Sequence, residues 1–249
     1  MIVRPEAGGL LLVTQPEHAR LAGAIAAAWR DGGLPSSPRR DEILLAAAEH
    51  DNGWQEADAE PSLDPVRGVP YDFLTAPPAL KQQVWTRGID RLAGRSAYAA
   101  ALVARHAAGL LAAYRGEADW APFFARLDRR LADLLARAAC APAEAAFETD
   151  YRFLYLADLI SLAFCCGWRQ PIDAHGYRLR SEGDRLLVDP DPFGGATVVL
   201  AVRARRAAAR RFASSAELHR VLAQAPETTI AGVAEGVRTA SESGGRRSS

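Results

Sequence analysis

The residues best suited to chemistry are His and Asp side chains that lie far apart in the sequence. His50 and Asp51 are adjacent, so they offer one imidazole and one carboxylate from neighbouring positions. Such a mixed nitrogen and oxygen pair suits a divalent transition metal better than Ca²⁺ or a structural Zn²⁺. Because two ligands do not hold a metal ion, other parts of the chain must supply the remainder. The candidates are His18, His106 and Asp158.

Helices are predicted to carry the first of these side chains. Thr14 and Glu17 have the spacing of a capping box, which places His18 in the opening turn of a helix that runs to about residue 29. A second segment, from 37 to 53, has apolar residues at helical spacing and carries His50 on its last turn. Rigid elements of this kind position ligands better than loops do.

Two further helices are predicted to carry His106 and Asp158. His106 shares a face with apolar residues in a helix from 96 to 114, where it is either a core His that donates to a carbonyl or a ligand. Asp158 has apolar neighbours in a helix from 142 to 167, where a carboxylate must be paired, protonated or metal-bound. Metal binding is the interpretation that also explains the other candidate ligands.

The order His, His-Asp, His, Asp resembles that of the HD superfamily of metal-dependent phosphohydrolases. In that superfamily a helical bundle brings a first His, a His-Asp pair and a distant Asp around one or two metal ions. The motif His50-Asp51-Asn52-Gly53 is similar to the superfamily's His-Asp-x-Gly. Many members continue with Lys, which could reach a phosphate, whereas this chain has Trp54. The resemblance implies that His18, His50, Asp51 and Asp158 bind the metal.

A closer resemblance is to an uncharacterised bacterial family, a domain of unknown function. It covers roughly the first two thirds of the chain and reaches its end more weakly. It implies a fold relation and no established activity. The segments that carry it are Thr14-Gln15-Pro16-Glu17-His18-Ala19, Glu49-His50-Asp51-Asn52-Gly53-Trp54, Ser96-Ala97-Tyr98 with Arg105-His106, and Asp158-Leu159-Ile160-Ser161-Leu162.

The predicted fold class is mainly α, an HD-like helical bundle with a small C-terminal β-rich appendage. Residues 1–170 are expected to form the helical metal-binding domain. Short β-like runs separated by turn signals begin near Tyr177, so residues 171–240 are assigned to the appendage, packed on the bundle. The Gly, Ser and Arg composition of 241–249 predicts a disordered tail.

Composition argues against nucleic-acid and membrane partners and indicates a cellular location. The 30 basic and 30 acidic residues give zero formal net charge, so neither nucleic acid nor an anionic membrane is expected as a partner. No stretch approaches the ~18 to 20 apolar residues of a membrane helix. The 3 Cys form no CxxC motif, which favours a reduced, cytoplasmic location. Whether the chain forms a homo-oligomer is left open by the sequence.

The leading functional hypothesis is a metal-dependent hydrolase of a phosphate ester or similar anionic small molecule. Its metal would be Mn, Fe, Ni or Co, as one or two ions, and would lower the pKa of a bound water. His106 would complete the metal shell, bind a second ion or act as general acid. Glu49 and Asp58 are candidates for orienting ligands or acting as general base. Candidate substrate-binding residues are Arg95, Lys81, Arg105 and Trp54.

Two alternatives use the same ligands. His and carboxylate ligands in a helical site also serve iron-dependent oxygenases. A non-catalytic sensor or binding domain could retain the constellation, and Trp54 in the place of Lys supports that interpretation. The chain has no Gly-rich phosphate loop and no G-x-S-x-G elbow, so nucleotide-cofactor enzymes and serine hydrolases are disfavoured. The long segment from 55 to 75 is predicted to be a binding loop or lid, with a packed structural Ω-loop as the alternative.

Overall fold

Helices make up about half of the chain in the computed structural model, which describes residues 1–140 and 145–237. The predicted tail, 241–249, lies outside the described residues. The α-helices are α1 (Gln15–Ala28), α2 (Arg40–Glu49), α3 (Gln55–Ala59), α4 (Pro78–Ala93), α5 (Ala97–Leu110), α6 (Ala121–Arg137), α7 (Ala145–Cys166) and α8 (Ser215–Gln224). Short 3-10 turns are η1 (Leu34–Ser36), η2 (Asn52–Trp54) and η3 (Ala112–Tyr114).

The helix starts follow the capping signals of the sequence. Thr14 Oγ1 accepts a hydrogen bond from the backbone N–H of Glu17 at the start of α1, which confirms the predicted cap. Ser96 caps α5 in the same way, through the N–H of Ala99. These local bonds satisfy backbone donors that the first turn of a helix leaves without partners. Helices α1, α2, α5 and α7 correspond to the four predicted helices, but α2 ends at Glu49, so His50 follows it instead of lying on its last turn. The predicted start at 142 lies outside the described residues.

One curled sheet joins the two ends of the described chain. Its strands are β1 (Ile2–Glu6), β2 (Gly9–Val13), β3 (Ile172–Ala174), β4 (Tyr177–Glu182), β5 (Arg185–Asp189), β6 (Thr197–Ala207) and β7 (Glu227–Gly236). Their order across the sheet is β1-β2-β6-β7-β5-β4-β3. All pairs are antiparallel except β5 with β7. The N-terminal hairpin thus continues the C-terminal strands.

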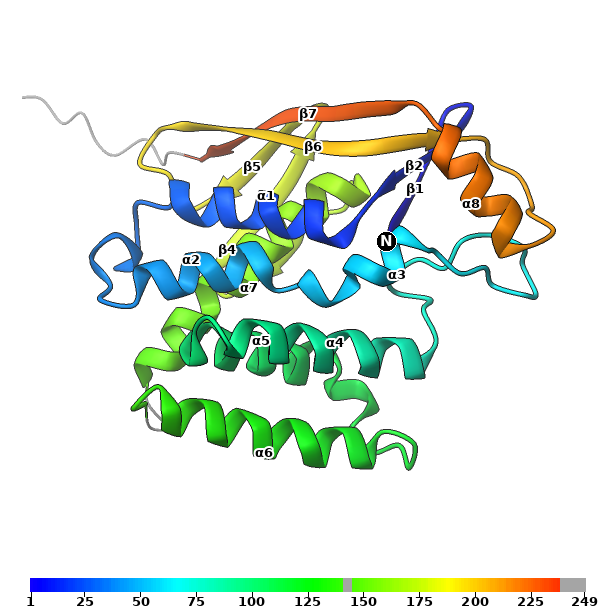
Figure 1. Ribbon diagram of the computed structural model, residues 1–249. Coiled ribbons are helices and arrows are strands. Elements are labelled where there is room, and N and C mark those ends of the chain that lie inside the picture. Colours follow the sequence, from blue (N-terminus) through cyan, green and yellow to red (C-terminus); the bar gives the residue numbers. More distant parts are fainter. Residues whose placement is uncertain (141–144, 238–249) are drawn as a thin grey trace, which may run out of the picture.

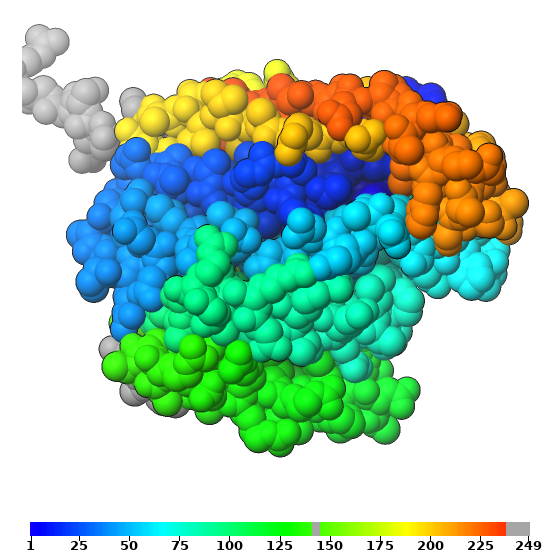
Figure 2. Space-filling view, viewed as in Figure 1, coloured from blue at the N-terminus to red at the C-terminus, as the bar shows by residue number. Residues whose placement is uncertain are grey.

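The helices form successive layers below one face of the sheet (Figure 1). Helix α1 packs against β6 on one side and against α2 and α7 on the other, and α5 lies between α2 and α6. The space-filling view shows α4 to α6 as the layer farthest from the sheet and α8 beside the N-terminal part of the chain (Figure 2). The alternating burial of β6 turns Val198, Leu200 and Val202 toward the helices.

Aromatic packing joins the sheet to the helical layers. Trp29, at the end of α1, is buried, and its ring contacts Phe153 of α7, Tyr177 of β4 and Phe193. The centroid distances are 5.9, 5.3 and 6.0 Å, typical of edge-to-face pairs. The core therefore runs continuously from the sheet into the helices.

The predicted fold class, a mainly α bundle with a small β appendage, is wrong. The sheet has seven strands among the described residues, and two of them, β1 and β2, precede the first helix. Local patterns predicted most of these strands separately, but the pairing of Leu11 in β2 with Arg206 in β6 joins residues at opposite ends of the chain. Such pairing depends on long-range packing, which periodicity within a short window does not report.

No helix in the described ranges is both long enough and apolar enough to cross a bilayer.

Candidate metal centre

Four helices bring the five predicted side chains into one buried cluster, which we call the His-Asp cluster. His18 lies in the first turn of α1, His50 and Asp51 directly after α2, His106 in α5 and Asp158 in α7. Both His18 and His106 are fully buried, and the other three are at most 6% exposed. Contacts among α1, α2, α5 and α7 hold the cluster together.

Asp158 lies at the centre of the cluster. Its Oδ1 is 2.9 Å from Nε2 of His18 and 3.2 Å from Nε2 of His50, and its Oδ2 is 3.3 Å from Nε2 of His106. The Nε2 atoms of His18 and His50 are 3.2 Å apart. Asp51 Oδ2 is 3.5 Å from Nε2 of His50 and 3.8 Å from Nε2 of His18. Three imidazoles and two carboxylates therefore direct donor atoms at one another.

Hydrogen bonds on the outer side of two rings determine which nitrogen faces the cluster. Ser161 Oγ donates to the carbonyl of His18, so it can accept from Nδ1–H of the same residue at 2.8 Å. Nδ1–H of His50 donates to the carbonyl of Ala47, also at 2.8 Å. In the neutral form, each ring consequently presents the lone pair of Nε2 to Asp158. Two lone pairs and a carboxylate at this spacing require a positive charge between them.

His106 differs from His18 and His50 in that its ring has no hydrogen bond to orient it among the described residues. Neither of its ring nitrogens has a hydrogen-bond partner in the part of the chain that the structure describes, and the approach of Nε2 to Asp158 lacks hydrogen-bond alignment. Its ring packs against the rings of Trp85 and Tyr155, with centroids 5.9 and 6.3 Å away. A fully buried imidazole without hydrogen-bond partners costs free energy, so a bound metal ion or molecule that paired with its nitrogens would be favoured.

The electrostatics of the cluster favour a cation. Burial opposes the charged form of His50, but the carboxylates of Asp51 and Asp158 outweigh it and raise the pKa of His50 to about 9. Burial also raises the pKa of Asp158, yet the three surrounding imidazoles hold that pKa well below its usual value. Without a metal, a proton on His50 supplies the positive charge. A metal ion can replace that proton, because it binds the deprotonated ligand.

The donor set fits a metal ion. Two groups of three residues, His18 with His50 and Asp51, and His50 with His106 and Asp158, offer ligand atoms that all lie within 4.8 Å of one another. Each group combines imidazole nitrogen with carboxylate oxygen, the chemistry that divalent transition metals accept. The outer hydrogen bonds of His18 and His50 are the kind that orient metal-binding imidazoles. The His-Asp cluster could therefore hold a metal ion.

The cluster forms part of the wall of a cavity of about 350 Å³, which we call the cluster cavity. His50, Asp51, His106 and Asp158 line it, whereas fully buried His18 supports them from behind. Six aromatic side chains make much of the remaining wall: Trp54, Phe73, Trp85, Tyr114, Tyr155 and Trp168. A largely apolar cavity with a few convergent polar groups is typical of small-molecule sites.

The predicted substrate-binding residues divide into two groups. Trp54 and Lys81 line the cluster cavity. Arg95 and Arg105 do not line it, and each is paired with a carboxylate elsewhere, Arg95 with Glu49 at 2.6 Å and Arg105 with Glu148 at 2.8 Å. The same pairing places Glu49, predicted to orient ligands or act as base, beside Arg95.

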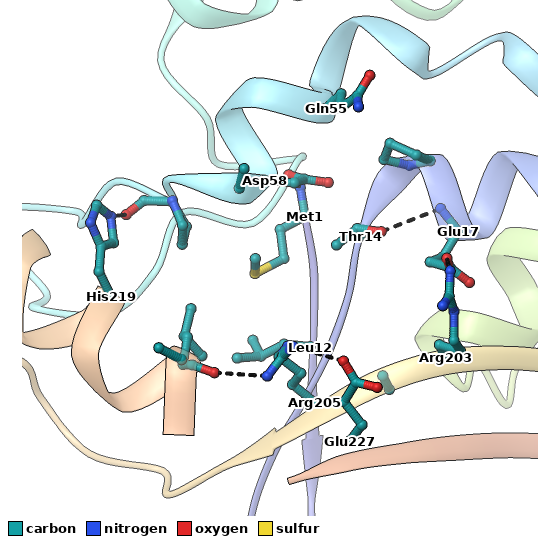
Figure 3. Close-up of a pocket in the computed structure, with 16 residues that line it drawn as sticks. Met1, Leu12, Thr14, Glu17, Gln55, Asp58, Arg203, Arg205, His219 and Glu227 are labelled. Atoms are coloured by element: carbon teal, nitrogen blue, oxygen red, sulfur yellow. Dashed lines mark hydrogen bonds and ion pairs between the residues drawn. The ribbon is translucent and has the colours of Figure 1, made fainter. Parts of the chain in front are cut away.

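Asp58 lies in a second cavity, of about 500 Å³, between α1, α3, α8 and the sheet (Figure 3). Its carboxylate is 2.6 Å from the terminal amine of Met1 and accepts the backbone N–H of Gln15. Burial raises the pKa of Asp58, and these two partners oppose the rise. Arg203 and Arg205 also line this cavity. The structure thus separates Asp58 from the cavity that contains the cluster.

Sequence reasoning missed several residues of the site. Ser161 and Gln15 received no role, although Ser161 is three residues from Asp158 on the same helix and Gln15 three from His18. Helical spacing could have suggested both. No role is assigned to Trp85 or Tyr155 from the sequence, and only the tertiary structure places their rings beside that of His106. The first part of the segment predicted to be a loop from 55 to 75 is helical, α3, whereas its last part contributes Phe73 and Leu74 to the cavity wall.

Fold and site together define the class, an α and β protein with a buried His and Asp cluster beneath an aromatic-lined cavity. The family model described as protein of unknown function (DUF3891) matches residues 1–208, and the chain belongs to that family. The predicted membership of a family of unknown function is thereby confirmed. Neither a curated protein nor a solved structure matches the chain. None of the comparisons links it to the HD superfamily.

Proposed function

We propose that the His-Asp cluster binds a divalent transition metal and that the protein is a metal-dependent hydrolase of a phosphate ester or a similar anionic small molecule. The observation that carries the proposal is the convergence of the Nε2 lone pairs of His18 and His50 on the carboxylate of Asp158, in the wall of a cavity. The order of the ligands along the chain, similar to that of the HD superfamily, adds to it.

The donor types support Mn, Fe, Ni or Co as the metal, because these ions accept imidazole and carboxylate together. The two groups of three ligands share His50, whose Nε2 lone pair binds one ion, so the cluster has three donors for a first ion and two remaining donors for a closely spaced second ion. A bound ion of this class acidifies a coordinated water and so supplies a nucleophile near neutral pH.

The side chains of the cavity supply the other requirements of ester hydrolysis. The water oxygen bonds to phosphorus, the bond to the leaving oxygen breaks, and a proton passes to that oxygen. With the ion held by the other four residues of the His-Asp cluster, His106 is left to hold that proton. Its ring nitrogens lie in the cavity wall and have no hydrogen-bond partner among the described residues. Lys81 would balance charge on the substrate, and the rings of Trp54 and Trp85 would keep bulk water away.

The test is metal analysis followed by hydrolysis assays. Purified protein is exposed separately to Mn²⁺, Fe²⁺, Co²⁺ and Ni²⁺, freed of excess ion, and examined by elemental analysis. We expect retained metal in the unchanged protein and loss of it in His50→Ala and Asp158→Asn. The metal-loaded protein should then hydrolyse aryl phosphate esters, and His106→Gln should lower the rate by about 10²- to 10⁴-fold, the usual contribution of an acid or base.

His219→Ala is the matched control, since His219 lies outside the cluster and donates to the carbonyl of Pro61. It should keep its metal and its activity. Full metal occupancy in His50→Ala would contradict the ligand assignment. Metal binding without turnover of any phosphate ester would contradict the hydrolase part of the proposal.

A further inference from the structure

The cluster cavity has a chemical character of its own, beyond its metal ligands. Its wall is dominated by aromatic rings and leucines, and two of those leucines, Leu74 and Leu110, are 63% and 47% exposed. They belong to the small set of large hydrophobic side chains that are exposed in the described parts of the chain. Apolar surface kept in contact with water at the wall of a cavity marks a binding surface.

Outside the His-Asp cluster, the cavity wall has one basic side chain among the described residues. Lys81 is the only lysine of the chain, and its Nζ donates to the carbonyl of Leu74 at 2.8 Å and lies 5.5 Å from the ring centroid of Tyr114. Arg105, which is adjacent in sequence to His106, is committed elsewhere: it makes two bonds to Glu148 and stacks on Tyr151. A triphosphate would therefore find too few cations.

Gln15 adds one hydrogen-bonding group. Its side chain is 2% exposed, lines the cluster cavity, and has an Oε1 atom with no partner within the described ranges. A buried polar atom without a partner costs free energy, so a substrate group that bonded to it would be favoured. The cavity thus combines an apolar wall, one cation and one unpaired polar atom.

From these observations we infer that the site selects a compact substrate with an apolar, ring-shaped body and a single anionic group, and that it discriminates against polyanions. This inference rests on the proposed function for the identity of the reacting group. The rings of Trp54, Trp85 and Tyr155 contact the body of the substrate, Lys81 contacts its anionic group, and Gln15 bonds to a polar substituent. The volume of about 350 Å³ is sufficient for a small aromatic ester.

The experiment compares three probes on the full chain by titration calorimetry: 1-naphthyl phosphate, inorganic phosphate and inorganic triphosphate. Each is titrated into protein treated with chelator, because metal-loaded protein is expected to hydrolyse the ester, and uptake of Mn²⁺ is measured on a separate portion of the same preparation. We expect 1-naphthyl phosphate to bind at least about tenfold more tightly than either other probe, because burial of its apolar rings contributes binding free energy that the inorganic anions cannot supply. It should also protect Lys81 from acetylation, as read by mass spectrometry.

Two substitutions separate the apolar and ionic contributions. Leu74→Ser should lower the affinity for 1-naphthyl phosphate about five- to tenfold. Val199→Ser, which changes an exposed side chain on β6, should leave that affinity unchanged. Lys81→Met should lower the affinity for 1-naphthyl phosphate but leave the affinity for neutral 1-naphthylmethanol unchanged. Both cavity variants alter residues at or near the surface, and circular dichroism confirms that they fold.

The outcomes distinguish the two proposals. If chelator-treated protein prefers 1-naphthyl phosphate while metal uptake fails, the substrate inference stands and the metal proposal is wrong. If the protein takes up Mn²⁺ but binds triphosphate or inorganic phosphate as tightly as 1-naphthyl phosphate, the inference on substrate class is overturned and metal binding stands. Equal effects of Leu74→Ser and Val199→Ser would also overturn it.

Discussion

Ser161 shows how a residue outside the ligand set governs one inside it. Its hydroxyl proton is directed to the carbonyl of His18, so its oxygen is left to accept from Nδ1–H of the same His. This arrangement fixes the tautomer that directs Nε2 at Asp158. A carbonyl, that of Ala47, does the same for His50. The chemistry of the cluster thus depends on hydrogen bonds one step away from the donor atoms.

Ser161→Ala is predicted to weaken metal binding by about 10- to 100-fold, because His18 would lose the bond that holds its ring and its tautomer. Competition with a chromophoric chelator measures the affinity. Ser214→Ala, which removes a similar hydroxyl from the cap of α8, serves as control and should leave the affinity unchanged. An affinity in Ser161→Ala equal to that of the unchanged protein would refute the orienting role.

At the scale of elements, the turn after α2 is held against α4 at very short range. Gly53, in η2, lies so close to α4 that a Cβ atom there would overlap the carbonyl of Val84. Arg87 of α4 donates to the carbonyl of Gly53 at 2.6 and 3.1 Å. The Gly of the His-Asp-x-Gly motif is therefore needed for close packing of the backbone that follows His50 and Asp51 against α4.

Gly53→Ala is predicted to destabilise the fold by about 1 to 3 kcal/mol or more, the usual cost of overpacking, since the obstacle is backbone rather than a flexible side chain. Urea unfolding followed by circular dichroism measures the change. Gly116→Ala is the control, because a Cβ at Gly116 meets no atom within 4 Å. Similar midpoints for the two variants would show that the contact with α4 is not tight.

An ion pair connects α1 to the sheet. Arg203 of β6 donates to Glu17 of α1 through Nε at 3.1 Å, and Arg20 pairs with the same carboxylate. Burial raises the pKa of Glu17, but the two arginines outweigh it and lower the pKa below 4.5. Because the folded pKa lies below the unfolded one, the stabilisation is fully present above pH 4.5 and is lost as the pH falls through the folded value.

Arg203→Ala is accordingly predicted to lower the thermal midpoint at neutral pH and to have a smaller effect as the pH falls below 4.5. Thermal melts of both proteins across this range test it. The control is Arg180→Ala, an exposed arginine of β4 that forms no ion pair with any residue the structure describes. A difference between Arg203→Ala and the unchanged protein that does not vary with pH would argue against ionic stabilisation by Glu17.

For the whole molecule, the cluster is a point where four helices of different layers meet. Helices α1, α2, α5 and α7 each supply part of it, and α1 in turn packs on β6. An ion bound by side chains from all four helices stabilises the folded chain as a unit, because the unfolded chain has no preformed site.

Saturating metal is predicted to raise the thermal midpoint of the protein. At about 100 times the dissociation constant the gain is about 2.7 kcal/mol, which corresponds to roughly 5 to 10 °C for a chain of this size. Scanning calorimetry with Mn²⁺ and with chelator measures the shift. His50→Ala should show no such response, and a midpoint in the unchanged protein that is independent of metal would contradict the site.

The sequence by itself determined the helices and the candidate ligands, because caps and apolar spacing act within a few residues. Thr14 and Ser96 predicted the starts of two helices. The order of His18, His50-Asp51, His106 and Asp158 predicted the members of the cluster. Tertiary structure alone decided the pairing of β2 with β6 and the separation of Asp58 from the cluster cavity. It also decided which cations face the cluster cavity, Lys81 and neither Arg95 nor Arg105. These features depend on which distant surfaces meet, and that is settled by the burial of the whole core rather than by any local pattern.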